Sequence, residues 1–265
     1  MGENAMKVRL REIHKTYRIP AGNLPVLQGI DLEIRSGEFV SLIGPSGCGK
    51  STIFNILSGL EVPDRGSVVL DGKEVTGRTG HVSYMMQKDC LLPWRTVLDN
   101  AILGAEVRGL SRRKAREKAR ELLPVFGLTD FADEYPSRLS GGMRQRAALL
   151  RTAVTGRDLW LLDEPFGSLD ALTREQMQDW LLGIRDRFGH TIGMITHSID
   201  EAIYLSDRIY VFTPRPARVK EILTVDLPRP RSRRMVTQEP FLRCKERLWR
   251  LLHEEEAADN PGTQL

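Results

Sequence analysis

The sequence predicts an α/β fold in which helices cover a mainly parallel sheet. Short apolar runs of strand length alternate with helical patterns, as they do in chains that build parallel sheets. The run at residues 38–44 leads directly into a glycine-rich loop and a helical pattern. Between about residues 91 and 155 the strand patterns stop and only helical spacing continues. We therefore expect an α/β core with an all-helical insertion.

The expected elements follow this periodicity in order. Strands are short apolar runs bounded by glycine or polar residues, and we expect them at residues 38–44, 66–72 (a hairpin strand with an Asp-Gly turn), 81–87, 158–165, 191–197 and 207–212. Helical spacing predicts helices within residues 51–60, 95–109, 111–127, 141–154 and 172–189.

The end of the chain has a different composition. From about residue 226 a Pro/Arg-rich linker precedes a predicted amphipathic helix at residues 239–252. We expect its apolar side chains to pack on the core rather than on a membrane; they are Phe241, Leu242, Leu248, Trp249 and Leu252. Residues 254–265 are acidic and polar and are expected to be disordered.

Composition limits the classes of partner. The chain has 265 residues and a formal net charge of +4, and much of the excess lies at residues 111–120 and 228–234. We interpret the former as a solvated helix face and the latter as a solvated linker. Aromatic residues make up only 6%, which argues against a nucleic-acid surface that stacks bases. No run approaches the length of a membrane span, so we expect the chain itself not to cross a membrane.

The segment "GPSGCGKST" at residues 44–52 matches the phosphate-binding pattern G-x-x-x-x-G-K-[ST] in full, between a predicted strand and a predicted helix. Its glycines let successive backbone N–H groups face phosphates. Lys50 supplies a positive charge, and the Ser51 hydroxyl suits Mg²⁺. The candidate binding residues are Gly44, Pro45, Ser46, Gly47, Cys48, Gly49, Lys50, Ser51 and Thr52. A bulky reagent on Cys48 is expected to block nucleotide binding.

Two carboxylates follow the buried strand "LWLL" at the carboxyl edge where open α/β sheets bind ligands. Because neighbouring residues of a strand point to opposite sides, Asp163 and Glu164 need not share one role. Asp163 suits the Mg²⁺ shell, and Glu164 suits a general base that activates water. His197 ends a later strand and is expected to hold a γ-phosphate and orient that water.

A second loop, "LSGGMRQR" at residues 139–146, opens another predicted helix. Ser140 is a suitable N-cap, and Gly141 and Gly142 leave backbone N–H groups for an anion at the helix N-terminus. The chain thus carries two potential phosphate loops.

Together with Gln87, "LLDEP", "SLD" at residues 168–170 and His197, these motifs resemble the nucleotide-binding subunit of an ATP-binding cassette (ABC) transporter over residues 6 to about 225. The resemblance implies the ABC ATPase fold: a P-loop NTPase core, an N-terminal antiparallel β-subdomain and a helical subdomain at about residues 91–155. It also implies ATP and Mg²⁺ as ligands.

The resemblance further implies a head-to-tail homodimer in which the phosphate loop of one copy and the "LSGG" loop of the other enclose the same ATP. Tyr17 resembles the aromatic residue that stacks on adenine, with simple strand packing as the alternative. Gln87 resembles the sensor of Mg²⁺ and γ-phosphate, and Asp170 the residue that links the two sites. Leu91, Leu92 and Trp94 resemble the groove for a permease coupling helix, or else belong to the core.

Three sequence segments most resemble those of the nitrate, sulfonate and taurine import group: "LLPWRTVLDN", "EPFGSLDALTRE" and "THSIDEAIYLSDRI". That implies separate permease and solute-binding subunits and a position at the cytoplasmic face of the membrane. An importer of thiamine-precursor pyrimidines is an alternative. Three other functions are less favoured. A non-transport ABC ATPase of DNA repair or translation usually has a coiled-coil insertion or tandem cassettes. A P-loop kinase does not need "LSGG", and a nucleotide-binding regulator without turnover does not need Glu164.

Overall fold

The computed structural model describes residues 5–259, with side chains up to His253. Within that range the chain divides into two compact units. The first unit holds the described residues up to Thr79 together with those from Ile195 on, and the second unit holds Gly80–Met194. None of the helices among residues 5–259 has both the length and the apolar composition that spanning a membrane requires.

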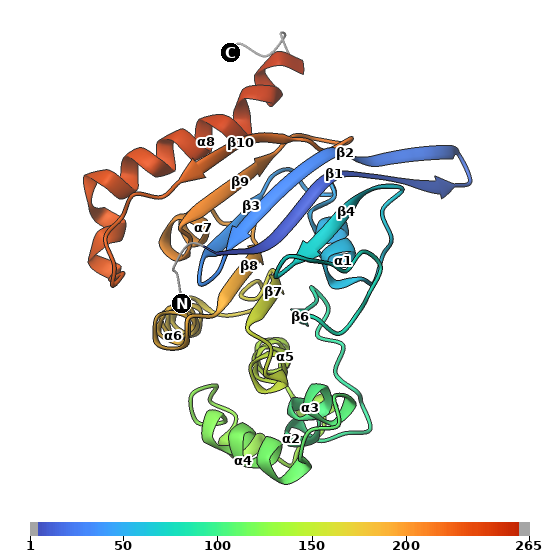
Figure 1. Ribbon diagram of the computed structural model, residues 1–265. Coiled ribbons are helices and arrows are strands. Elements are labelled where there is room, and N and C mark those ends of the chain that lie inside the picture. The colour runs from blue at the N-terminus through green and yellow to red at the C-terminus, as the bar shows by residue number, and fades with distance from the viewer. Residues whose placement is uncertain (1–4, 260–265) are drawn as a thin grey trace. The chain divides into compact units, whose positions relative to one another are not determined.

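The first unit begins with an antiparallel sheet of strand order β2-β1-β4-β5 (Figure 1). The long strands β1 (Met6–Ile19) and β2 (Gly22–Arg35) pair from Met6 opposite Arg35 to Ile19 opposite Gly22. β4 (Arg65–Leu70) pairs with β1, and the predicted Asp-Gly turn leads from β4 into β5 (Lys73–Glu74). Asp71 and Gly72 both have positive φ there, as the tight turn requires.

The first unit also contains the strand that leads into the phosphate loop. β3 (Phe39–Ile43) is buried along its whole length and pairs in parallel with β9 (Arg208–Phe212). β9 pairs antiparallel with β10 (Val219–Thr224), which the sequence did not predict because its apolar pattern is short. The helices of this unit are α1 (Lys50–Ser58), α7 (Ile199–Leu205) and α8 (Glu239–Asp259), with a 3-10 turn at Arg233–Thr237.

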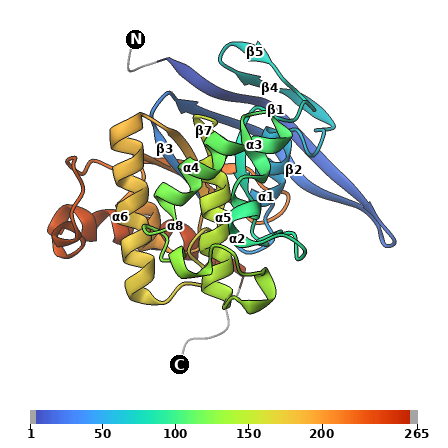
Figure 2. The same ribbon diagram turned by 90° about the horizontal axis from the view of Figure 1, so that it is seen from below.

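The second unit combines parallel strands with the helical stretch. β6 (Ser83–Met85) pairs in parallel with β7 (Leu159–Asp163), and α6 (Ala171–Phe188) leads to β8 (Thr191–Ile195), whose last residue belongs to the first unit. Residues 91–155, all of them described, contain no strand, as predicted. They form α2 (Val97–Ala101), α3 (Leu103–Val107), α4 (Arg112–Leu122), α5 (Gly141–Thr155) and 3-10 turns at Thr129–Phe131 and Pro136–Arg138. Figure 2 shows α2, α3 and α4 gathered around α5.

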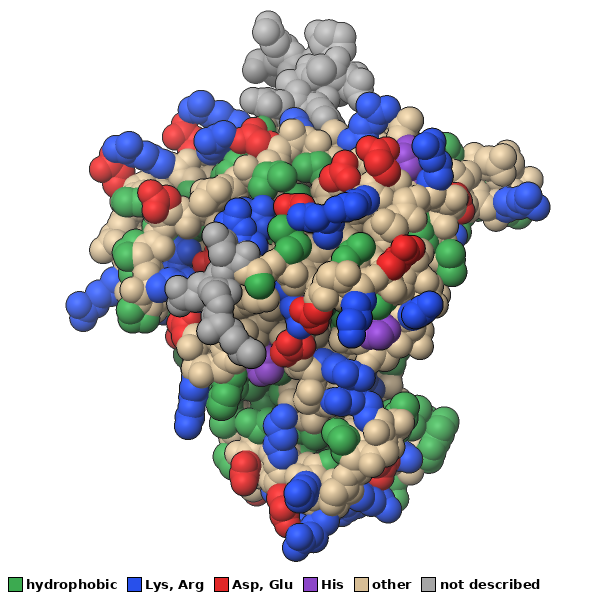
Figure 3. Space-filling model, viewed as in Figure 1, with side chains coloured by type: hydrophobic (Ala, Val, Ile, Leu, Met, Phe, Trp, Pro, Cys, Tyr) green, Lys and Arg blue, Asp and Glu red, His purple; other side chains and the backbone are tan. Residues whose placement is uncertain are grey.

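Most of the basic segment at residues 111–120 is a solvated helix face, as predicted, but Arg112 and Arg116 also form ion pairs with Asp99. α4 buries Ala115 and Ala119 and exposes most of its charged side chains. Figure 3 shows basic side chains mixed with acidic ones over this part of the second unit.

The second basic segment is not a freely solvated linker, so that prediction is wrong. Arg229 donates to Asp207 Oδ1 from Nε (3.0 Å) and Nη2 (2.7 Å), and Arg231 donates to the Ser206 carbonyl at 3.0 Å. The Arg233 guanidinium lies 4.2 Å from the centre of the Tyr204 ring. The segment is therefore fixed to the end of α7 and the start of β9.

The prediction for α8 is confirmed for two of its five apolar residues. Phe241 and Leu248 are fully buried, whereas Leu242 and Trp249 are about half exposed and Leu252 is intermediate. Residues seven apart share one narrow stripe of a helix, and their neighbours lie about 100° around it. The helix continues to Asp259, so the disorder predicted for residues 254–259 is wrong. Residues 260–265 of the expected disordered tail lie outside the described residues.

Candidate active site

The phosphate loop lies in the first unit between β3 and α1, as predicted. Gly47 and Gly49 have φ of 73° and 122°, a region that side chains disfavour. A Cβ on Gly49 would also lie 2.8 Å from side-chain atoms of Val26 and Leu27. The glycines are therefore required both for the curl of the loop and for its close packing.

Lys50 lies inside this loop, with only 5% of its surface exposed. Its Nζ donates to the carbonyls of Gly44 (2.8 Å) and Pro45 (2.9 Å). Cys48 is 1% exposed, and its Sγ is 3.8 Å from the same Nζ. Ser51 is exposed in the first turn of α1, where backbone N–H groups favour an anion. Curled glycines, a buried ammonium and a helix N-terminus together fit a nucleotide phosphate.

His197 also belongs to the first unit, directly after β8. The Thr196 N–H donates to the Leu42 carbonyl at 3.4 Å, which places this segment beside β3. The Thr196 hydroxyl accepts from the Ser198 N–H at 3.0 Å, and Ser198 caps α7. The exposed His197 thus stands between two fixed residues at the same end of β3 as the phosphate loop.

Tyr17 lies in the β1–β2 hairpin opposite Leu24 and is partly exposed. The Lys15 Nζ is 5.2 Å from the centre of its ring. Burial of Lys15 by itself would lower its pKa, but the neighbouring carboxylates of Glu61 and Asp64 act together with Tyr17 and raise the pKa. The stacking role of Tyr17 stays a prediction.

The two acidic candidates lie at the end of β7 in the second unit. Asp163 is the last residue of this fully buried strand and is 2% exposed. Glu164 is half-buried and has a φ of 51°, which is unusual for a residue with a side chain. The different roles expected of the two carboxylates thus coincide with a left-handed turn of the backbone between them.

The second loop also lies in the second unit and caps α5 as predicted, because the Ser140 hydroxyl accepts from the Met143 N–H at 3.2 Å. A Cβ on Gly142 would lie 3.2 Å from the Ser168 carbonyl, so the loop packs closely there. Gln87 and Gly141 line one pocket of about 350 Å³; its other lining residues are Met85, Lys88, Asp89, Arg144, Gln145 and Ser168.

Asp170 has a local role that the sequence did not indicate. It is the N-cap of α6 and accepts from the Thr173 N–H at 3.0 Å, and this hydrogen bond lowers the pKa of its exposed carboxyl. Its expected role between two active sites stays a prediction.

Sequence reasoning missed three side chains of α5 that hold the surrounding loops. Gln145 contacts the backbone of Glu164 and Ser168, at 2.7 Å each. Arg151 donates to the carbonyls of Asp89 (2.6 Å) and Cys90 (2.7 Å), and Arg144 donates to the Asp89 carboxylate at 3.1 Å. Arg144 and Gln145 belong to the segment "LSGGMRQR", and all three residues lie on a predicted helix, but neither fact indicates the loops they reach.

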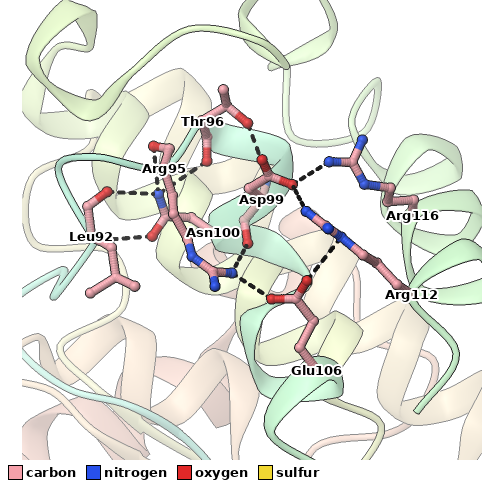
Figure 4. A network of polar contacts seen from close by, with 8 residues as sticks. All are labelled: Leu92, Arg95, Thr96, Asp99, Asn100, Glu106, Arg112 and Arg116. Atoms are coloured by element: carbon pink, nitrogen blue, oxygen red, sulfur yellow. Dashed lines mark hydrogen bonds and ion pairs between the residues drawn. The ribbon is translucent and has the colours of Figure 1, made fainter. Parts of the chain in front are cut away.

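The segment expected to face a permease is held by a polar network within the second unit (Figure 4). Asn100 is fully buried and contacts backbone groups of Leu92, Arg95 and Thr96. Asp99 and Glu106 pair with the nearby arginines 95, 112 and 116. Trp94 is 71% exposed, whereas Leu91 is only 9% exposed. Of the expected contact residues, Trp94 is accessible and Leu91 belongs to the core.

Comparison with known proteins identifies the family. The ABC transporter family model matches residues 27–167. An uncharacterized ABC transporter ATP-binding protein of Methanocaldococcus jannaschii is 42% identical over 94% of this chain and 92% of its own length. Two relatives of Synechococcus elongatus, a bicarbonate transport and a nitrate import ATP-binding protein, are 44% and 43% identical over 88% and 86% of this chain, but over only 36% and 35% of their own lengths.

Solved structures agree with this relationship. The dimeric structure of an ABC transporter cassette matches with a TM-score of 0.77 and 29% identity, over 83% of this chain and all of that one. A dimeric post-hydrolysis state bound to ADP and phosphate matches with a TM-score of 0.76 and 30% identity over the same shares. The predicted ABC ATPase fold is thereby confirmed, and the chain belongs to the ABC transporter family as an ATPase that binds ATP with Mg²⁺ and hydrolyses it.

Proposed function

We propose that this chain is the ATP-hydrolysing subunit of an importer for a small solute, within the group that takes up nitrate, sulfonates and taurine. The support is its similarity to the relatives named for bicarbonate transport and nitrate import. The solute itself is expected to be selected by a separate permease and a solute-binding protein, and the ATPase then lies at the cytoplasmic face of the membrane. The exposed Trp94 on its rigid loop suits a contact with a permease helix.

We further propose that two copies pack head to tail and enclose two ATP molecules. The phosphate loop with Lys50 would hold the phosphates of one ATP, and Ser140, Gly141 and Gly142 of the other copy would bind the same molecule. Two phosphate-type loops in one chain support this, as does the dimeric state of the similar cassettes.

For hydrolysis, we assign Glu164 as the general base and His197 as the residue that orients the attacking water and the γ-phosphate. Oxygen atoms of Ser51, Gln87 and Asp163 are the hard ligands that Mg²⁺ prefers. Mg²⁺ would neutralise charge that develops on the phosphates. The half-buried position of Glu164 supports its role as the general base. Fewer solvent molecules reach a half-buried carboxylate, so that it can hold one ordered water molecule for the attack.

Size-exclusion chromatography of Glu164→Gln with Mg-ATP and with Mg-ADP tests both proposals. We expect a dimer with ATP only, and an ATPase rate lower by about 10²–10⁴. Glu121→Gln, an exposed residue of α4, is the matched control and should hydrolyse ATP at the wild-type rate. A wild-type rate in Glu164→Gln would refute its role as base, and a monomer with ATP bound would contradict the proposed dimer of isolated subunits.

A further inference from the structure

We propose that Gln145 is a positioning residue that holds the backbone of Glu164 and thereby aims the catalytic carboxylate. The inference rests on the proposed role of Glu164 and gives a specific role to Gln145, which the sequence analysis named only as part of the segment "LSGGMRQR". All the groups involved lie in the second unit.

The Gln145 side chain bridges two backbone groups with its two polar atoms. Its Nε2–H donates to the Glu164 carbonyl at 2.7 Å, and its Oε1 accepts from the Ser168 N–H at 2.7 Å. The residue is 8% exposed, so water competes little for these bonds. Only an uncharged side chain that donates at one end and accepts at the other satisfies both partners.

The bridge acts where the backbone is under strain. A φ of 51° at Glu164 costs free energy that the surroundings must offset. The Gly167 N–H also donates to the Glu164 carbonyl at 3.3 Å, which closes the turn from one side. Gln145 holds the turn from the other side and fixes both the carbonyl of Glu164 and the loop that follows it. If the bridge is lost, Glu164 can relax to an ordinary φ, and its carboxylate then points elsewhere.

The helix that carries Gln145 starts at the second phosphate loop. Ser140 caps this helix, and Gly142 packs against the Ser168 carbonyl. Gln145 therefore connects the first turns of α5 rigidly to the backbone of the catalytic carboxylate. A contact that moves the start of α5 would therefore also move Gln145, which holds the Glu164 backbone.

The experiment compares steady-state ATPase kinetics of Gln145→Met, Gln145→Glu and the control Thr152→Val. Thr152 lies on the same helix, is also buried, and its hydroxyl donates to the Ala148 carbonyl of its own helix. Gln145→Met keeps the shape and removes both bonds, so we expect kcat to fall about 10- to 100-fold while KM changes less than about threefold. Thr152→Val is expected to leave both values near those of the wild type.

The pH profile of Gln145→Glu separates positioning from a general packing defect. An ionised carboxylate cannot donate to the Glu164 carbonyl, whereas the protonated form has the same donor and acceptor as the amide. We expect kcat relative to wild type to be low at pH 8 and to recover as the pH falls towards 6, since burial raises carboxyl pKa values. This comparison also decides the matter if Gln145→Met fails to fold.

A kcat of Gln145→Met within twofold of Thr152→Val, or a Gln145→Glu profile parallel to wild type, would overturn the inference. Glu164→Gln is measured beside them. If it loses activity while Gln145→Met does not, the inference alone fails. If Glu164→Gln itself keeps the wild-type rate, the proposed function fails.

Discussion

Replacing Asn100 with alanine removes the side chain that holds the loop carrying Trp94. The Asn100 Oδ1 accepts from the Leu92 N–H at 2.8 Å. Its Nδ2 lies 3.0–3.1 Å from the carbonyls of Leu92, Arg95 and Thr96, but carries only two hydrogens to share among them. The side chain therefore makes about three hydrogen bonds, each worth about 1 kcal/mol net. We expect Asn100→Ala to lower the free energy of unfolding by about 3 kcal/mol.

Thermal and urea unfolding measure this loss directly. A loss of about 3 kcal/mol corresponds to a fall in Tm of roughly 6–12 °C for a chain of this size. Asn23→Ala, an exposed residue of the β1–β2 hairpin, is the matched control and should change stability by less than about 0.5 kcal/mol. A loss below about 1 kcal/mol in Asn100→Ala would refute the reasoning, because buried backbone groups would then have found other partners at little cost.

Three further predictions concern the phosphate loop and the second unit. Lys50→Ala should raise the Kd for ATP about 10- to 100-fold in calorimetry, since a charge-assisted hydrogen bond is worth about 1.5–3 kcal/mol; an unchanged Kd would contradict its role. Cys48 is buried, so maleimide should modify it more slowly than the exposed Cys90, and its complete modification should abolish ATPase activity; full activity after modification would contradict this. Burial lowers the pKa of His190 in the folded state, so the native state binds fewer protons than the unfolded state. The free energy of unfolding that this group contributes is present above pH ~6.5, the pKa of an unfolded histidine. It is lost as the pH falls from there through the lower pKa of the folded state. Urea unfolding of His190→Phe should show a weaker loss between pH 7 and 5, and equal slopes would exclude His190 as the cause.

Local patterns predicted most of the elements because each is specified by a few adjacent residues. The mostly apolar sequence of β3 and the glycines after it predict a strand and a loop from adjacent residues alone, and in the structure all five residues of β3 are buried. The Asp-Gly turn after β4 is likewise encoded in two residues whose positive φ values the structure contains. The strand β10 was not predicted because its longest apolar run is the pair Ile222-Leu223, of which only Leu223 is buried in the structure.

Arginine-rich segments illustrate the limit of such patterns. Residues 111–120 and 228–234 are both rich in arginine. Most charged side chains of the first segment face solvent, apart from Arg112 and Arg116, which pair with acidic residues, whereas the second segment is bound to Asp207 and the carbonyl of Ser206. Both segments have an excess of basic residues, and only the groups that lie opposite the side chains decide between solvation and pairing.

By itself, the sequence determined the chemistry of this protein: a phosphate loop with its lysine, two carboxylates after a buried strand, a capped second loop, and hence the family of ATPases to which it belongs. Only the tertiary structure decided how those groups are held. Gln145 lies in the segment "LSGGMRQR" and Asn100 in another helical pattern, and their partners Glu164 and Leu92 lie 19 and 8 positions away in the chain. Their importance comes from their burial and from the backbone groups that folding brings opposite them. The periodicity of one segment predicts neither the burial nor these partners.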